Sequence, residues 1–207
     1  MLYTYGGAGQ VPLQAGQARF GNGVAQFNAL VERAKRAVVD LPPDCRVGIA
    51  PHSLRATAPA ELAEVLAAHP EVSTHIHIAE QPKEVADISD WLGARPVDWL
   101  LANAEVNENW CLIHATHMTE AETAALARTG AVAGLCPVTE ANLGDGPFNG
   151  PGYLAAGGRF GIGSDSNVLI SLTEELRTLE YSQRLRDLAR NVMVPGEGSV
   201  GETLYTG

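Results

Sequence analysis

The sequence is poor in cysteine, and its cysteines form no recognisable framework. Cys45, Cys111 and Cys136 are odd in number, far apart and without a CxxC pair. This pattern excludes a disulfide scaffold and a structural zinc knuckle. Cys111 and Cys136 lie inside apolar runs, so we expect them to be small core residues.

Basic residues are also scarce: 14 Lys and Arg stand against 24 Asp and Glu, a net charge of −10. Nucleic acids and anionic membranes bind basic surfaces, so neither is an expected partner. The Arg-rich stretch 177–190 lacks interleaved aromatics and is interpreted as the solvated side of a helix. No apolar run approaches the ~20 residues of a membrane span, and no signal-peptide pattern opens the chain. A soluble, cytoplasmic protein is expected.

The chain does contain an alternation of short apolar runs with segments of helical spacing. Its 45% hydrophobic content over 207 residues is enough for one sizeable core. Six runs predict strands at residues 2–5, 46–53, 73–80, 110–117, 130–137 and 159–166. Repeated strand–helix units predict an α/β fold with a parallel sheet.

Helices are expected between these strands. Apolar spacing predicts one over 24–38, and others begin at Pro59 and around Val85. A short helix is expected over 96–104, and Thr119 with Glu122 and Ser171 with Glu174 mark two capped helix starts. The Gly-rich segment 140–153 is expected to be a long loop.

Both a doubly wound open sheet and a (β/α)₈ barrel are compatible with this order. The barrel is favoured because polar residues end at least four strands, whereas an open sheet gathers its ligands at one switch point. Neither GxGxxG nor GxxxxGK[ST] follows a strand, which removes the usual nucleotide sites.

Four acid and imidazole side chains stand at these strand ends: His77, Glu80, His114 and Asp165. Strand ends converge on one mouth of a barrel, where two His, one Glu and one Asp can hold zinc and move protons. A metal-dependent hydrolase is the leading interpretation. Each residue also has an ordinary explanation, since a strand His is often a hydrogen-bonded core group and an Asp often forms a turn.

A fourth strand end carries His52 and Arg55. The guanidinium fork of Arg55 suits a planar carboxylate, although a surface ion pair is an equal alternative. An acidic protein that binds an anionic substrate needs local cationic groups, and these two residues can supply them.

These motifs resemble the amidohydrolase superfamily, and within it the formimidoylglutamate deiminases of histidine degradation. The matching segments are PHSLRA, HIHIAEQPKEV, WCLIHATH, GLCPVTEANLGDG and GIGSDSNV, and the similarity runs over nearly the whole chain. The resemblance implies a distorted (β/α)₈ barrel with one zinc ion, bound by His77 and Asp165.

The resemblance also implies the remaining roles. Asp165 would accept a proton from the attacking water, and Glu80 and His114 would form the proton-handling and polarising pair. His52 and Arg55 would bind the substrate carboxylates. The implied reaction is deimination of N-formimino-L-glutamate to N-formylglutamate and ammonia.

One departure from the family pattern is large. The family's first strand carries an HxH pair with two zinc ligands, but the only HxH here is His75 and His77, which matches a different strand. We therefore expect residues 1–207 to be a partial barrel domain of about six of eight β-α units. The first strands and a small β domain would be absent, and this chain alone inactive or dependent on pairing.

Two other functions stay open. One is an aminohydrolase or chlorohydrolase acting on a neutral purine, pyrimidine or triazine ring, in which Arg55 would lack its carboxylate. The other is a non-catalytic remnant or assembly partner that keeps the fold without the metal. For each of these functions a homo-oligomer stays open.

Overall fold

The fold is a parallel sheet of four strands with helices between them, seen in a computed structural model that describes residues 1–194 and 196–207. The strands are β1 (Thr74–Ile78), β2 (Trp110–His114), β3 (Val132–Leu135) and β4 (Arg159–Ile162). They pair in the order β1-β2-β3-β4, and each pairing is parallel. Each new strand is added on the same side of the previous one, with no reversal of the kind that defines a doubly wound sheet. The arrangement is therefore that of an incomplete barrel, as predicted.

Two of the six predicted strands are wrong as full strands. Residues 2–5 and 46–53 form only isolated parallel bridges, Leu2 with Pro51, Ile49 with Thr74 and Ser53 with His77. These bridges still place the two segments beside β1 in chain order, so six extended segments run side by side. The hydrogen-bond ladder between residues 46–53 and β1 is interrupted at Pro51, because proline has no N–H to donate.

Helices follow the sequence pattern closely up to β3. The bounds are α1 Val24–Val38, α2 Pro59–Ala68, α3 Pro82–Leu92, α4 Pro96–Asn103, α5 Glu120–Arg128, α6 Pro137–Leu143, α7 Gly150–Ala155, α8 Leu172–Asp187 and α9 Val200–Thr206, with a short 3₁₀ turn at Ala18–Phe20. Thr119 caps α5 as predicted, with Glu122 closing the capping box. Ser171 precedes α8 as predicted, although its side chain makes no capping bond.

The predicted loop 140–153 is wrong, because it contains most of α6 and part of α7. Pro137 occupies the first turn of α6, where its missing N–H costs nothing. Asn149 caps α7 by accepting a hydrogen bond from the Gly152 N–H. Gly144 ends α6 with a φ of +74°, a conformation that glycine adopts without strain.

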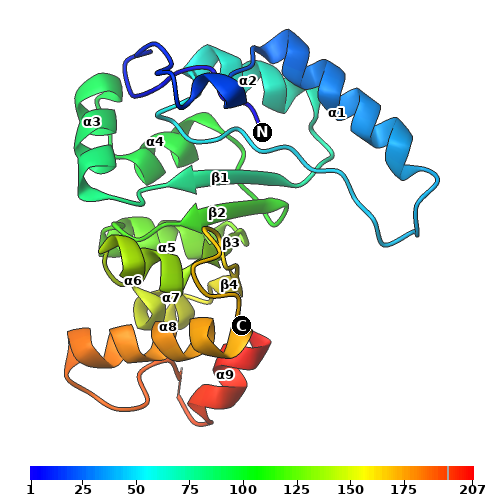
Figure 1. The fold of residues 1–207 in the computed structure, drawn as a ribbon. Coiled ribbons are helices and arrows are strands. Elements are labelled where there is room, and N and C mark those ends of the chain that lie inside the picture. Colours follow the sequence, from blue (N-terminus) through cyan, green and yellow to red (C-terminus); the bar gives the residue numbers. More distant parts are fainter. Residues whose placement is uncertain (195) are drawn as a thin grey trace.

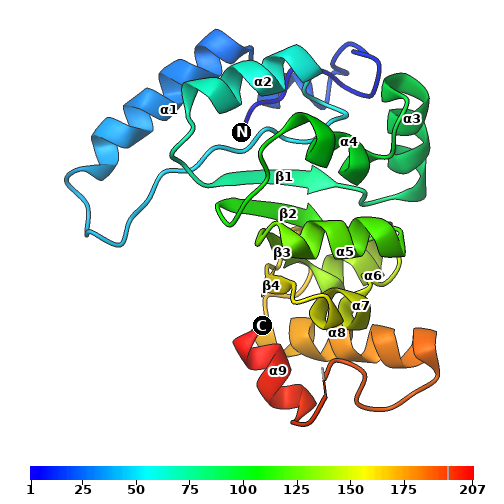
Figure 2. The same ribbon diagram turned by 180° about the vertical axis from the view of Figure 1, so that it is seen from behind.

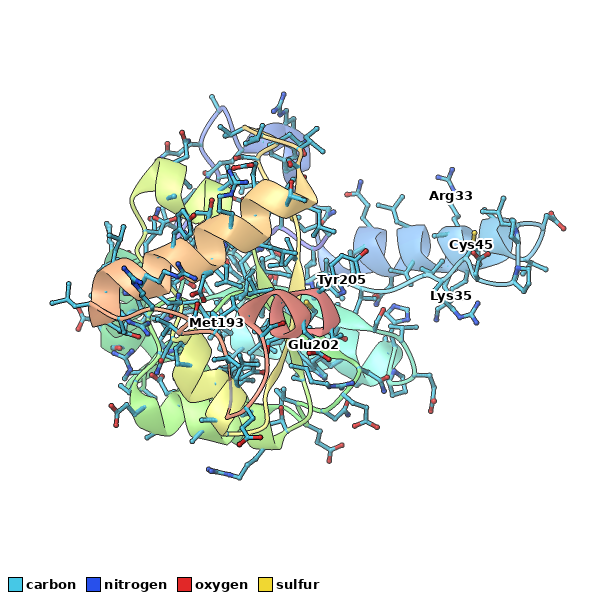
Figure 3. All side chains as sticks on the ribbon, turned by 90° about the horizontal axis from the view of Figure 1, so that it is seen from below. Arg33, Lys35, Cys45, Met193, Glu202 and Tyr205 are labelled. Carbon is cyan, nitrogen blue, oxygen red and sulfur yellow. The ribbon has the colours of Figure 1, made fainter. Side chains whose placement is uncertain are left out.

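Figures 1 and 2 show the strands stacked in order, with α1 and α2 beyond β1 and with α8 and α9 beyond β4. In Figure 3, α1 and the loop that follows it project from the body, and Arg33, Lys35 and Cys45 lie on this arm. No helix within residues 1–194 and 196–207 has the length and apolar character needed to cross a membrane.

The two faces of the sheet differ in burial. Ile76, Ile78 and Leu112 are fully buried among the helices, within the main core. The alternate residues His75 and Cys111 lie on the opposite face, where the first is exposed and the second half-buried. Since side chains alternate along a strand, the functional side chains of the sheet emerge on the open face or at its carboxyl edge.

Candidate active site

The candidate site lies at the carboxyl ends of β1 and β2. In the register of these strands His77 is opposite Ile113, and Ile78 is opposite His114. The rings of His77 and His114 stack with centroids 5.6 Å apart. The ring of His52 also lies close to that of His77, with centroids 4.7 Å apart. The structure therefore brings the three predicted imidazoles together, with His77 in contact with both of the others.

His77 is held in a defined tautomer. Its Nδ1 lies 2.7 Å from the carbonyl oxygen of His52, and a carbonyl can only accept, so Nδ1 carries the hydrogen. Nε2 is then the nitrogen with a free lone pair. Burial lowers the pKa of His77, with a smaller contribution from the neighbouring His114. A neutral imidazole with a free Nε2 is the form in which histidine binds a metal ion.

His114 reaches the site through an unusual backbone conformation. Trp110 and Leu112 are buried toward the helices, and simple alternation would point His114 the same way. Its φ of +69°, followed by +48° at Ala115, is left-handed and breaks the alternation. Such conformations cost a non-glycine residue of order 1–3 kcal/mol, and they are concentrated at functional sites.

The electrostatic surroundings of His114 favour its charged form. Burial by itself lowers the pKa of His114, but the hydrogen bond to Glu140 and the charges of Glu80 and Asp165 raise it above its ordinary value. Its Nδ1 lies 3.1 Å from Glu140 Oε1, and its Nε2 lies 3.7 Å from Glu80 Oε1. An imidazole between two carboxylates can both take up and release a proton.

Arg55 joins the site through Glu80. Its Nη2 donates to Glu80 Oε2 at 3.0 Å, and its Nε lies 3.8 Å from Glu84 Oε1. Glu84 lies in the first turn of α3, is fully buried, and accepts a hydrogen bond from the Glu80 N–H at 2.9 Å. Arg55 also lines an open cavity of about 710 Å³ with Lys83 and glycines of the N-terminal loop. The predicted carboxylate-binding group is therefore in direct contact with Glu80, one member of the predicted proton-transfer pair.

The surroundings of His52 disfavour its charged form. Burial lowers the pKa of His52 to about 3, and the neighbouring charges of His77 and Arg55 act in the same direction. Its Nδ1 is hydrogen-bonded to Ser53 Oγ at 2.8 Å. In this environment the ring offers a hydrogen bond rather than a charge, and its contact with a substrate carboxylate stays a prediction.

Asp165 follows β4 in a left-handed conformation, with a φ of +43°. Its side chain is exposed, and its charge raises the pKa of both His77 and His114, which places it at the same mouth. Its loop is tied to α6, because Thr139 Oγ1 is hydrogen-bonded to Ser166 Oγ at 2.9 Å.

Sequence reasoning missed the buried carboxylates behind the site. Glu140 bonds to His114, and Glu84 lies behind Arg55 and Glu80. Both are acids in the first turn of a helix that directly follows a strand, and this position could have drawn attention to them. His117, three residues after His114, is not part of this group, because its Nε2 is hydrogen-bonded to the Asp145 carbonyl.

These side chains fit a zinc ion in kind but not in number. His77 and Asp165 supply the nitrogen and oxygen donors that zinc takes, whereas protein zinc sites use three or four ligands. Within residues 1–194 and 196–207, no group of three or more His, Cys, Asp or Glu side chains is arranged to hold a metal ion. The described residues can thus provide only part of a coordination shell.

This fold and site define a class of hydrolytic enzymes, and the chain belongs to the amidohydrolase family, whose model matches residues 12–197. The chain is 52% identical over 207 residues to a protein named formimidoylglutamate deiminase from Pseudomonas aeruginosa. That match covers 99% of this chain and 45% of the relative. It is also 32% identical, over 66% of its length, to a 5-methylthioadenosine/S-adenosylhomocysteine deaminase of Desulforudis audaxviator, covering 33% of that protein.

Solved structures agree with this assignment. An amidohydrolase from Brucella melitensis superposes with a TM-score of 0.96 at 52% identity, covering 100% of this chain and 46% of that one. An adenosine deaminase from Xanthomonas campestris with bound zinc gives a TM-score of 0.71 at 24% identity, over 82% of this chain and 39% of that one, and supports the fold alone. The chain covers between 33% and 46% of the length of these four proteins.

Proposed function

We propose that the chain is part of the catalytic barrel of a zinc-dependent deiminase that converts N-formimino-L-glutamate to N-formylglutamate and ammonia in histidine degradation. The observation that carries this proposal is the contact between Arg55 and Glu80, whose other oxygen faces His114. A cation for a substrate carboxylate is then held directly beside the proton-transfer pair. The 52% identity to the Pseudomonas aeruginosa deiminase supports the same substrate.

In this proposal the side chains of the site have distinct tasks. Arg55 binds a carboxylate of the substrate through its guanidinium fork. Asp165 takes a proton from the attacking water, and Glu80 and His114 deliver protons to the terminal nitrogen of the formimino group. The bond from carbon to that nitrogen then breaks, ammonia leaves, and the carbon becomes a formyl group.

His77 and Asp165 would hold the zinc ion, which when bound lowers the pKa of a coordinated water to about 7. The other ligands would come from a polypeptide outside residues 1–207. We propose that this region contributes an HxH strand, and that the 207-residue chain alone is inactive. We propose that the site binds a small anionic substrate. We also propose a cytoplasmic location for the protein.

A segment-replacement experiment tests the proposal. The 207 residues would replace the matching 45% of the Pseudomonas aeruginosa deiminase, and ammonia release from N-formimino-L-glutamate would be measured. We expect the chimaera to bind stoichiometric zinc and to release ammonia, and the isolated chain to do neither. Ammonia release by the isolated chain would contradict its proposed inactivity, and a zinc-loaded chimaera without this activity would contradict the substrate.

The role of Arg55 is tested in the same chimaera. Arg55→Ala should lower kcat/KM for formiminoglutamate about 10- to 100-fold, because a charge-assisted hydrogen bond contributes about 1.5–3 kcal/mol. Lys83→Ala removes an exposed cation from the same cavity and is the matched control. A neutral adenine-type substrate should respond weakly to either change. Equal losses on anionic and neutral substrates would favour the alternative aminohydrolase. That alternative is also suggested by the similarity to the Desulforudis protein, which is named a 5-methylthioadenosine/S-adenosylhomocysteine deaminase.

A further inference from the structure

Behind His114 lies a buried carboxylate to which the proposed reaction assigns no task. Glu140 is 3% exposed and stands in the first turn of α6, directly after β3. Its Oε1 accepts two hydrogen bonds, one from the Cys136 N–H at 2.9 Å and one at the His114 Nδ1 at 3.1 Å. One oxygen atom therefore links the ring of His114 to the backbone at the end of β3.

This contact constrains the position of the hydrogen on the ring. An ionised carboxylate can only accept, so His114 Nδ1 must carry a hydrogen to make this bond. The opposite nitrogen, Nε2, is the atom that faces Glu80 at 3.7 Å. The backbone N–H of Cys136 fixes the carboxylate in turn, and the carboxylate fixes both the tautomer and the angle of the ring.

We infer that Glu140 is a positioning residue that holds His114 in the Nδ1-protonated tautomer, so that Nε2 is the nitrogen presented to Glu80 and to substrate. The catalytic consequence rests on the proposed function: proton transfer at Nε2 requires that nitrogen to face the reacting atoms. Carboxylates that orient a functional histidine in this way serve both nucleophilic triads and metal sites.

The alternative is that Glu140 serves only as a helix cap. Glu175 offers a control for that role, because it is equally buried and its Oε2 accepts a hydrogen bond from the Val138 N–H of the same helix at 2.8 Å. A substitution at Glu175 removes a buried carboxylate and one backbone hydrogen bond of α6 but leaves the partner of His114 in place. The two roles therefore predict different spectra for the same two substitutions.

The test is ¹⁵N NMR of the histidine rings in the 207-residue chain, without metal or substrate. The spectra would be recorded at a pH high enough for the ring of His114 to be neutral, because its surroundings raise the pKa of His114. In the neutral ring we expect a protonated-type signal at Nδ1 and a bare-type signal at Nε2. Glu140→Ala should shift the tautomer ratio toward the Nε2-protonated form by about tenfold or more, since a hydrogen bond to a charged group is lost. Glu140→Gln should rescue the wild-type ratio, because its amide oxygen can accept both bonds, and Glu175→Ala should leave the ratio unchanged.

Three results would overturn the inference. They are a neutral wild-type ring protonated at Nε2, an unchanged ratio in Glu140→Ala, and an equal change in Glu140→Ala and Glu175→Ala. The wild-type spectrum tests the predicted tautomer of His114 even if Glu140→Ala does not fold. This test measures no turnover, so it is independent of the substrate. If the spectrum is as expected but the enzyme acts on another substrate, the proposed function is contradicted and this inference stands.

Discussion

Lowering the pH from 7 to 5 should destabilise the folded chain through His52. Burial lowers the pKa of this ring from 6.5 to about 3. The folded chain therefore keeps the ring neutral at pH 5, while the unfolded chain takes up a proton below pH 6.5. Because the unfolded state binds more protons in this range, the free energy of unfolding falls as the pH falls.

The size of the effect follows from the two pKa values. At pH 7 the unfolded ring is mostly neutral, and at pH 5 it is almost fully protonated. Integrating proton uptake between these limits gives a loss of about 2 kcal/mol in the free energy of unfolding. Since pH 5 lies well above a pKa of about 3, protonation of the folded ring contributes almost nothing to this figure.

Urea unfolding at pH 7 and at pH 5 would measure the effect in the wild type and in His52→Gln. The wild type should lose about 2 kcal/mol more than the variant over this interval. His75→Gln, which removes an exposed imidazole from the open face of the sheet, is the matched control. The same pH dependence in the wild type and in His52→Gln would refute the assignment of a half-buried, neutral His52.

Two further predictions concern stability. Tyr153 is fully buried and its hydroxyl donates to the Ala131 carbonyl at 2.9 Å; Tyr153→Phe leaves that carbonyl unpaired and should cost about 1–3 kcal/mol in urea unfolding, and an unchanged midpoint would show that the bond contributes nothing. Thr119 accepts a hydrogen bond from the Glu122 N–H at 3.1 Å, so Thr119→Ala should cost about 1 kcal/mol, whereas Thr119→Ser should restore most of it if capping is the cause.

The predicted fold held where local pattern and tertiary packing agree. The strand around His77 and the helix capped by Thr119 have both apolar periodicity and a start signal, and both formed as expected. Residues 46–53 have the apolar pattern but only isolated bridges, because a proline interrupts the possible ladder. The Gly-rich segment after Pro137 forms helices that the sequence pattern did not predict. Their capping bonds depend on residues whose roles are visible only in the structure.

The candidate site was predictable in its members and less so in its geometry. Strand-end position was enough to select His77, Glu80 and His114, which the structure brings together. Alternation alone would have turned His114 toward the helices, and only its backbone φ shows how it reaches the site. Glu140 was not selected because its partner lies 26 residues away on another strand. The catalytic roles of all these residues stay predictions.

Three strand ends contain a residue in the left-handed backbone region. They are Ala79, His114 and Asp165, with φ of +49°, +69° and +43°. None is a glycine, so each conformation persists only while surrounding contacts enforce it. Weakening those contacts should release these strand ends before the sheet itself opens, as a local rather than a global transition. The arrangement of the site side chains is thus a more sensitive indicator of the native state than the secondary-structure content. A sample with a full helical signal can already have lost the arrangement of its histidines.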